Sequence, residues 1–240
     1  MAHIRALFFD VDDTLYSTSR FSERARRAAL DAMIALGLRA DAEALYRELR
    51  EVIEEFSPNS SSHFDKLLLR LDPACRAGIN PALLVAAGVV AYREVKTRDL
   101  APFPGVYAAL EALARTTLIR GIITQGATFQ QAEKIVRLGI HRYLTPDAIF
   151  ISDQLGISKP NVKIFRRALD AVGVTPAEAV YVGDNPVMDI DPPNALGMVT
   201  IRYCGPGKHA DVLGTTRPDF EIRTFPELLD VLRDALGIAV

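Results

Sequence analysis

The sequence predicts an α/β protein, a doubly wound parallel sheet that carries an inserted all-helical cap domain. Three observations predict this fold class. A short apolar run near the N-terminus ends in acidic residues, four helical patterns then follow without a strand between them, and strand-like runs alternate with helical patterns from residue 101 onward. Strands that alternate with helices form parallel sheets with helices on both faces. We therefore expect a discontinuous core domain, residues 1–15 and 101–240, and a cap domain at residues 16–100.

The first strand is predicted at residues 4–9, an apolar run without helical period that is followed by Asp10, Asp12, Asp13 and Thr14. Such a run is typical of a strand that is buried on both faces of a parallel sheet. Because this strand needs the later strands to form a sheet, the helical block that follows it is interpreted as an insertion.

Four helical patterns make up the predicted cap, at residues 19–37, 41–56, 62–72 and 80–97. In the first pattern the apolar residues of one helix face are Leu30, Met33, Ile34 and Leu36. A polar segment at residues 57–63 separates the second pattern from the third, and its Ser, Pro and Asn residues favour a loop.

From residue 101 the pattern changes, with Pro102, Pro104 and Gly105 at the boundary. Helices are predicted at residues 106–115, 129–138, 160–172 and 186–196, and strands at residues 118–124, 148–152, 179–184 and 198–202.

Composition and charge exclude several classes of protein. The 240 residues are 49% hydrophobic with a formal net charge of −2, which suits a full core and offers no basic face for nucleic acid. The two cysteines, Cys75 and Cys204, lack the spacing of a zinc site and fit a reducing compartment. No apolar run reaches the roughly 20 residues of a membrane span or resembles a secretion signal. We therefore expect a cytoplasmic protein that binds neither nucleic acid nor membranes.

Polar residues follow three of the predicted strands: Asp10 and Asp12 after the first, Thr124 at residues 118–124, and Asp184 at residues 179–184. The carboxyl ends of parallel strands meet at one crevice, where ligands bind. Asp10 and Asp12 are two residues apart, so in extended backbone their side chains project to the same side. A lone Asp at a strand end is often a turn former or a helix cap. Clustered carboxylates, however, repel one another unless a divalent cation neutralises them, and Mg²⁺ prefers carboxylate oxygens.

Lys159 directly precedes Pro160, and because proline favours the first turn of a helix, we expect its ammonium near a helix start. Taken singly, Lys159 is interpreted as a solvated charge and Thr124 as a helix cap. Together, a hydroxyl, a backbone amide at Gln125 or Gly126 and an ammonium would grip phosphate oxygens opposite a metal.

Four motifs occur along the chain: FFDVDDTL at residues 8–15, IIT at 122–124, SKP at 158–160 and GDNPVMD at 183–189. On these motifs the sequence resembles the haloacid dehalogenase-like (HAD) superfamily, and within it the phosphatase branch with a helical cap between the first two motifs. The resemblance covers nearly the whole chain, and the DxDxT signature after an apolar run is specific. It implies a Rossmann-like core and a magnesium-dependent phosphatase.

The resemblance also implies roles for individual residues. Asp10 would attack phosphorus to form an aspartyl-phosphate, and Asp12 would protonate the leaving oxygen and then deprotonate the attacking water. Thr124 would hold a phosphoryl oxygen, and Lys159 would stabilise the nucleophile and the developing charge. The implied metal-site residues are Asp10, Asp12 through its backbone carbonyl, Asp184, and Asp189, which would support either the metal or Lys159.

Two departures from the family pattern concern the second and fourth motifs. Such sequences commonly read TNG where this chain has Thr124, Gln125 and Gly126, which puts the contact from the middle side chain in doubt. After Asp189, where many relatives carry a Gly-Ala pair, this chain continues with Asp191, Pro192 and Pro193. Two prolines would stiffen or shorten the start of that helix.

Rival functions predict other residues. A 2-haloacid dehalogenase attacks carbon, releases no alkoxide and needs no metal, so Asp12 and Asp184 argue against it. A phospho-accepting signalling domain, a member of a different functional class, is about half this length and places its acceptor on a later strand. A catalytically silent scaffold would not retain all the expected side chains.

The cap is expected to encode the choice among small phosphorylated metabolites, because the core motifs reach only the phosphate. The substrate-binding candidates are Thr14, Gln125 and Gly126 in the core, and Tyr16, Ser19, Arg20, Asn59, Ser61, His63 and Phe64 in the cap. The ordinary interpretation of the polar cap residues is a solvated loop. Residues 205–209, by default a surface loop, are a further candidate for the crevice rim. The sequence leaves open which metabolite is bound and whether the protein is a monomer or a homodimer.

Overall fold

The computed structural model describes residues 3–56, 62–207 and 209–240, without the side chains of residues 19–21. The chain divides into two compact units. One consists of Met1–Ser19 and Ala101–Val240, and the other of Arg20–Leu100. Each unit is described by itself below.

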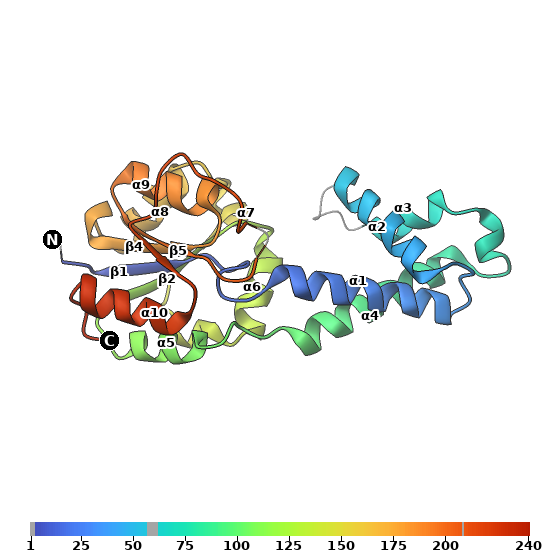
Figure 1. Cartoon of the computed structure of the whole chain (residues 1–240), viewed down its shortest axis with the longest axis horizontal. Helices are drawn as coiled ribbons and strands as arrows, with labels where there is room; N and C mark the ends of the chain where they lie inside the picture. Colours follow the sequence, from blue (N-terminus) through green and yellow to red (C-terminus); the bar gives the residue numbers. More distant parts are fainter. Residues whose placement is uncertain (1–2, 57–61, 208) are drawn as a thin grey trace. The chain divides into compact units, whose positions relative to one another are not determined.

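A six-stranded sheet forms the centre of the first unit (Figure 1). The strand order is β3-β2-β1-β4-β5-β6, and every neighbouring pair is parallel. The chain starts at the middle of the sheet and winds outward in both directions, which confirms the predicted doubly wound fold. The strands are β1 (Ala6–Phe9), β2 (Ile119–Thr124), β3 (Ile149–Ile151), β4 (Ala179–Gly183), β5 (Val199–Tyr203) and β6 (Phe220–Ile222).

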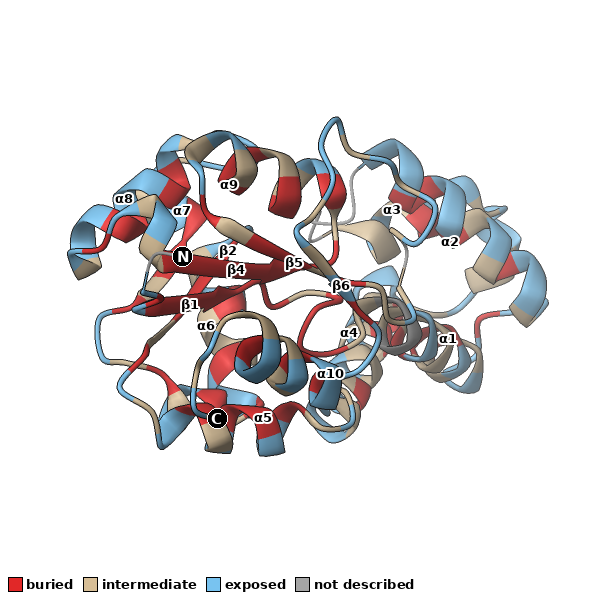
Figure 2. Ribbon diagram, turned by 60° about the vertical axis from the view of Figure 1, so that its left-hand side comes forward, coloured by how far each residue is buried: buried red, intermediate tan, exposed pale blue. Residues whose placement is uncertain are grey.

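Helices cover both faces of this sheet, so β1 and β4 are buried along their whole length (Figure 2). Figure 1 shows α8 and α9 on one face, and α5 and α10 on the other. The aromatic rings of Phe165 and Tyr181 pack edge to face in the core, 5.0 Å between centroids. The α-helices of this unit are α5 (Val106–Ala114), α6 (Thr128–Arg137), α7 (Ser152–Leu155), α8 (Lys163–Val172), α9 (Asp191–Leu196) and α10 (Phe225–Asp230).

The prediction that the helix after Lys159 begins at residue 160 was wrong, because α8 starts at Lys163. The Asn161 side chain accepts a hydrogen bond from the Lys163 amide at 3.0 Å, and the Asn161 amide donates to the Ser158 carbonyl at 3.0 Å. These bonds hold a turn ahead of the helix. Lys159 therefore lies in the loop before α8, as predicted, but three residues are between it and the helix start.

The predicted helix at residues 186–196 has the predicted bounds, but its winding changes along its length. A π-helical turn, Pro186–Ile190, passes directly into α9 at Asp191. Pro192 and Pro193 have no amide hydrogen, so the α-helical ladder cannot continue through them, and they occupy the first turn of α9 instead. The two prolines thus lie just after the point where the π-helical turn passes into α9.

The C-terminal part of the first unit was not predicted. It contains β6, α10 and a π-helical turn, Val231–Ala235. β6 is only three residues long, too short to show a period of two. Shorter 3-10 turns lie at Ile140–Tyr143 and Pro176–Glu178.

The second unit is all-helical. Its helices begin and end within two residues of the predicted positions, and its core is formed by buried leucines together with Met33 and Ile53. No helix of the described residues is long and apolar enough to cross a membrane. The helices are α1 (Thr18–Ala35), which starts in the first unit, α2 (Ala42–Phe56), α3 (His63–Arg70) and α4 (Pro81–Asp99), with a 3-10 turn at Pro73–Arg76.

Candidate active site

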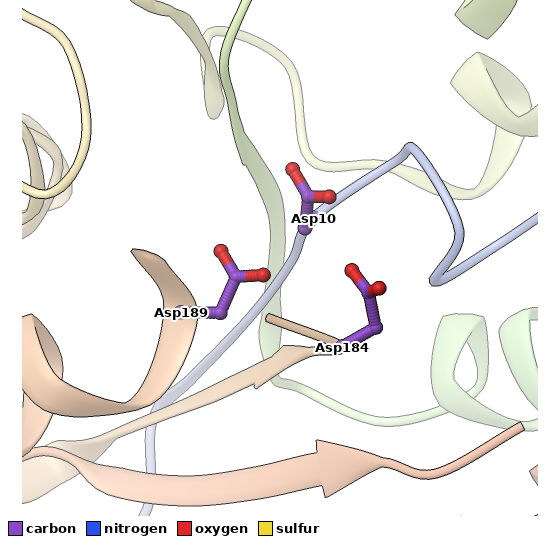
Figure 3. A group of neighbouring side chains, drawn as sticks. All are labelled: Asp10, Asp184 and Asp189. Atoms are coloured by element: carbon purple, nitrogen blue, oxygen red, sulfur yellow. The ribbon is translucent and has the colours of Figure 1, made fainter. Parts of the chain in front are cut away.

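Three buried carboxylates converge at the carboxyl ends of β1 and β4 (Figure 3). Asp10 follows β1, Asp184 follows β4, and Asp189 comes from the π-helical turn that begins at Pro186. One oxygen of each carboxylate lies within 4.8 Å of the others. β1 and β4 are the neighbours at which the winding direction of the sheet reverses, which is where an open α/β sheet forms its ligand site.

Lys159 supplies an ammonium to this carboxylate cluster. Its Nζ lies 2.9 Å from Asp10 Oδ1 and 2.6 Å from Asp189 Oδ1, and only 5% of the residue is exposed. Burial opposes the charged form, but the Asp10 and Asp189 carboxylates raise the pKa of Lys159 well above its ordinary value. The ammonium therefore stays charged inside the protein.

Tyr181 and the backbone hold Asp189 and Lys159 in place. The Tyr181 hydroxyl lies 3.0 Å from Lys159 Nζ and donates to the Ile123 carbonyl at 2.8 Å. Asp189 Oδ2 accepts a hydrogen bond from the Asn185 amide at 3.1 Å. Both oxygens of Asp189 are thus engaged by this chain, one by Lys159 and one by Asn185. This arrangement favours support of Lys159 over direct metal ligation as the role of Asp189.

Asp184 contacts a histidine of the segment after β5. His209 Nδ1 lies 2.7 Å from Asp184 Oδ2, and His209 Nε2 lies 3.2 Å from Asn185 Nδ2. The guanidinium of Arg202 donates to the backbone carbonyl of His209 at 2.9 Å. Part of the segment at residues 205–209 therefore does lie at the rim of the site, although its Lys208 is outside the described residues.

The carboxylate cluster fits a divalent cation. Burial, with neighbouring carboxylates adding to it and Lys159 opposing it, raises the pKa of Asp10 to about 6. Burial likewise raises the pKa of Asp184, although the His209 hydrogen bond acts in the opposite direction. Three buried carboxylates around one ammonium leave excess negative charge, and oxygen ligands of this type suit Mg²⁺.

Asp12 lies in a different environment from Asp10. Lys134 Nζ is 2.8 Å from both of its carboxylate oxygens, Gln131 Nε2 is 3.0 Å from Oδ2, and the Tyr16 hydroxyl donates to Oδ1 at 2.5 Å. Burial works against ionisation, but the Lys134 charge and these hydrogen bonds outweigh it and lower the pKa of Asp12. The carboxylate of Asp12 is thus not a member of the cluster around Lys159.

Two threonine hydroxyls of the motifs are buried without a partner. Among the described residues, the hydroxyls of Thr14 and Thr124 make no hydrogen bond. An orphaned buried hydroxyl costs free energy unless a ligand or water completes it. Thr124 ends β2 at the same edge of the sheet as Asp10, so its free hydroxyl is available to a ligand there.

The two residues after Thr124 act mainly through their backbone. The Gln125 side chain is exposed, and its carbonyl accepts a hydrogen bond from Gln131 Nε2 at 2.8 Å. Gly126 has a φ of +144°, and its amide donates to the Ser152 hydroxyl at 3.0 Å. Within the described residues, the Gln125 side chain, which replaces the common asparagine of the second motif, therefore makes no hydrogen bond to the cluster around Lys159.

The substrate-binding candidates of the predicted cap are only partly described. Tyr16 is buried in the first unit, where its hydroxyl is engaged by Asp12 instead of being open to a substrate. His63 begins α3 and Phe64 packs edge to face on Tyr92, both within the second unit, and their roles stay predictions. The side chains of Ser19 and Arg20, and the whole of Asn59 and Ser61, lie outside the described residues.

Sequence reasoning missed Gln131, Lys134 and Tyr181. Gln131 and Lys134 are three residues apart on the helix that follows the second motif, so they share a face, and this was a usable signal. Tyr181 lies in an otherwise apolar buried strand, where an aromatic residue is ordinary. Nothing local distinguishes its hydroxyl from that of any core tyrosine.

Comparison with known proteins relates this site to a family. A sequence model described as haloacid dehalogenase-like hydrolase matches residues 4–197. Glyceraldehyde 3-phosphate phosphatase of Methanopyrus kandleri is 46% identical over 96% of this chain and 98% of its own length. The protein of the same name from Pyrococcus furiosus is 41% identical over 99% of this chain and 96% of its own. The crystal structure of a HAD phosphatase from Thermococcus onnurineus is 25% identical, covers 99% of this chain and 100% of its own, and gives a TM-score of 0.67.

Proposed function

This chain belongs to the haloacid dehalogenase-like hydrolases and is a phosphatase, and we propose that it hydrolyses a small phosphomonoester through an aspartyl-phosphate on Asp10. One observation carries the proposal. Asp10 is buried in contact with the Lys159 ammonium, and the carboxylate of Asp12, two residues away, is held by a separate set of donors.

In the first step an oxygen of Asp10 forms a bond to phosphorus while the bond from phosphorus to the leaving oxygen breaks. The Asp12 carboxylate, which Lys134 holds in its ionised form, takes up a proton from solvent as the phosphate dianion binds and then gives that proton to the leaving oxygen. Lys159 offsets the charge on Asp10 and the transferring group, and the unpartnered hydroxyl of Thr124 donates to a phosphoryl oxygen.

In the second step water attacks the aspartyl-phosphate. Asp12, now a carboxylate, takes a proton from the water, inorganic phosphate leaves, and Asp10 and Asp12 return to the states they had with substrate bound. One residue thus serves as acid and then as base, and a positioned group of this kind contributes roughly 10²- to 10⁴-fold.

Asp10, Asp184 and the backbone carbonyl of Asp12 would hold Mg²⁺ beside the phosphoryl group. When bound, the ion supplies positive charge to the phosphoryl oxygens and permits a dianion to approach buried carboxylates. Asp189 orients Lys159 in this scheme, since Lys159 and the Asn185 amide already engage its two oxygens.

Glyceraldehyde 3-phosphate is the first candidate substrate, because two relatives that match nearly the full chain carry the name of a phosphatase for it. The helical unit, Arg20–Leu100, would act as the cap that recognises the rest of the substrate. We place the reaction in the cytoplasm, since Cys75 and Cys204 are both free and fit a reducing compartment.

The test combines two substrates and two variants. Wild-type protein with Mg²⁺ is expected to hydrolyse p-nitrophenyl phosphate and glyceraldehyde 3-phosphate, and chelation of the metal should stop both reactions. Acid quenching should trap labelled phosphate on wild-type protein and none on Asp10→Asn. Asp12→Asn should still accept phosphate from p-nitrophenyl phosphate but release it at least about 10²-fold more slowly.

Circular dichroism must show that both variants remain folded. Turnover by folded Asp10→Asn at a rate near wild type would refute Asp10 as the nucleophile. Full activity on both substrates in the presence of a chelator would refute the role of the metal.

A further inference from the structure

Three hydrogen-bond donors from two separate segments converge on the Asp12 carboxylate. Lys134 Nζ contacts both oxygens at 2.8 Å, Gln131 Nε2 contacts Oδ2 at 3.0 Å, and the Tyr16 hydroxyl contacts Oδ1 at 2.5 Å. None of these donors belongs to the four sequence motifs of the core. The motifs therefore account for Asp12 but not for what surrounds it.

The placement of α6 explains two of the donors. This helix follows the polar end of β2 after a short connection, so its first turns lie near the strand ends. Residues three apart share one face of a helix, and Gln131 and Lys134 therefore present their polar groups to the same side. Gln131 is 3% exposed, so its amide is fixed by packing.

Gly126 allows this close approach. A Cβ atom built at Gly126 would lie 2.5 Å from Gln131 Nε2, closer than any ordinary contact. Gln131 Nε2 also donates to the Gln125 carbonyl at 2.8 Å, so the same amide ties the second motif to Asp12. The glycine of the second motif thus has a steric role in the placement of Gln131.

The two functional carboxylates have separate ammonium partners. Lys159 and Asp10 have side chains 3% and 9% exposed, whereas Lys134 and Asp12 have side chains 15% and 26% exposed. A carboxylate that keeps this much contact with solvent can turn about its side-chain torsion unless it is restrained. Lys134, which contacts both oxygens, restrains that rotation more than a single hydrogen bond would.

We propose that Lys134, Gln131 and Tyr16 are positioning residues that hold the Asp12 carboxyl where it exchanges protons with the leaving oxygen and with the attacking water. The inference rests on the proposed function, in which Asp12 gives one proton and later regains one. Lys134 keeps its own protons throughout, and it acts through Asp12 without touching the substrate.

The test compares a leaving group that needs a proton from Asp12 with one that does not. The alkoxide of glyceraldehyde 3-phosphate must be protonated as it leaves, whereas p-nitrophenolate leaves unprotonated. Lys134→Met keeps an unbranched side chain of nearly the same length and removes the ammonium. We expect its turnover of glyceraldehyde 3-phosphate to fall about 10²-fold, while the first-turnover burst of p-nitrophenolate falls by less than about threefold.

After that burst, which should approach one equivalent per site, steady release is expected to be slow because the attack of water also needs Asp12. Lys134→Arg should restore much of the turnover, since a guanidinium can also contact both carboxylate oxygens. Tyr16→Phe removes one donor and keeps the ring. Its turnover of glyceraldehyde 3-phosphate should also fall more than its p-nitrophenolate burst, but both losses should be smaller than in Lys134→Met. Lys163→Met, a matched change at an exposed lysine of α8, should alter neither rate.

Equal losses in the burst and in the turnover of glyceraldehyde 3-phosphate would overturn the proposal, because a merely structural role predicts them. Unchanged turnover in Lys134→Met would overturn it as well. If Lys134→Met does not fold, Tyr16→Phe decides by the same two measurements. Failure of the proposed function is distinguishable, because wild-type protein would then show no trapped phosphate on Asp10.

Discussion

Asp10 and Asp12 are two residues apart, yet the regions around them differ in burial, charge and titration. Asp10 lies among buried acids with one ammonium, and its pKa is raised to about 6. Asp12 is half-buried and receives donors from Lys134, Gln131 and Tyr16, and its pKa is lowered. Around Asp10, three carboxylates share the single ammonium of Lys159. Around Asp12, one carboxylate is paired with the ammonium of Lys134.

Of the two carboxylates, Asp10 is therefore the one that depends on a partner from outside the chain. A cluster with excess negative charge is completed by a cation, whereas a neutralised pair is complete by itself. The sequence places both acids at one strand end, but the neighbouring helices and loops give them opposite surroundings. Three experiments test this contrast: replacement of Lys159 or Lys134, binding of Mg²⁺, and displacement of Gln131.

The largest expected effect comes from Lys159→Met. It leaves the Asp10 and Asp189 carboxylates buried without their ammonium, so the free energy of unfolding should fall by about 3–5 kcal/mol. Lys134→Met leaves a carboxylate that water can still reach, so the loss there should be at most about 1 kcal/mol. Urea denaturation of the two variants at pH 8 measures both values.

The loss in Lys159→Met should shrink at pH 5, where the freed carboxyls can take up protons. Equal losses for the two variants at pH 8 would show that the regions do not differ as described.

A smaller effect is expected from the metal. Mg²⁺ at 100 times its dissociation constant should stabilise the wild-type protein by about 2.7 kcal/mol, seen as a higher melting temperature. The folded-state pKa of Asp10, about 6, lies above its ordinary value of 3.8, so the metal-free protein should lose stability as pH rises between those values. Because Mg²⁺ requires ionised carboxylates, the same Mg²⁺ concentration should raise the melting temperature more at pH 7.5 than at pH 5.

Asp184→Asn should abolish most of this shift, because it removes one carboxylate of the cluster. A shift of the same size at both pH values, or one that survives in Asp184→Asn, would contradict the description of the Asp10 region.

The smallest effect is expected from Gly126→Ala. Its new methyl group would meet Gln131 Nε2 at 2.5 Å and push the amide away from Asp12, at a cost of about 1–3 kcal/mol. Activity on glyceraldehyde 3-phosphate should fall several-fold, by less than in Lys134→Met, because Lys134 still restrains Asp12. Thermal unfolding and steady-state kinetics measure the two quantities.

Gly139→Ala is the matched control. Gly139 also has a positive φ, +65°, but a Cβ there meets nothing within 4 Å. It should lose about 1 kcal/mol of stability through backbone strain and no activity. An equal loss of activity in both variants would show that the contact with Gln131 is not responsible.

Much of the fold followed from local pattern. The strand before Asp10 is buried on both faces and therefore has a continuous apolar run. The helices of residues 19–97 bury one face each, so their apolar residues recur at the helical period. The missed elements lack such a period. β6 has three residues, and the π-helical winding at Pro186–Ile190 depends on which backbone hydrogen bonds form ahead of Pro192 and Pro193.

The candidate site could be anticipated only in part for a related reason. Asp10 and Asp184 come together because parallel strands end at one edge of the sheet, and the π-helical turn after β4 adds Asp189. Lys159 was expected beside a helix start, but it lies in a turn before α8. Its ammonium contacts the Tyr181 hydroxyl, and the Asn185 amide binds Asp189, the second carboxylate partner of Lys159. His209 was considered only as one residue of a rim segment, not as the partner of Asp184.

Local patterns in the sequence were enough to place the strands as far as β5, most of the helices and the acids that follow β1 and β4, because periodicity and strand ends are local properties of a chain. The ion pairs, Lys159 with Asp10 and Lys134 with Asp12, are set by tertiary packing alone. This pairing depends on how α6 is rotated against the sheet and on the path of the turn before α8. Packing between segments more than 100 residues apart sets both, and no local pattern records it.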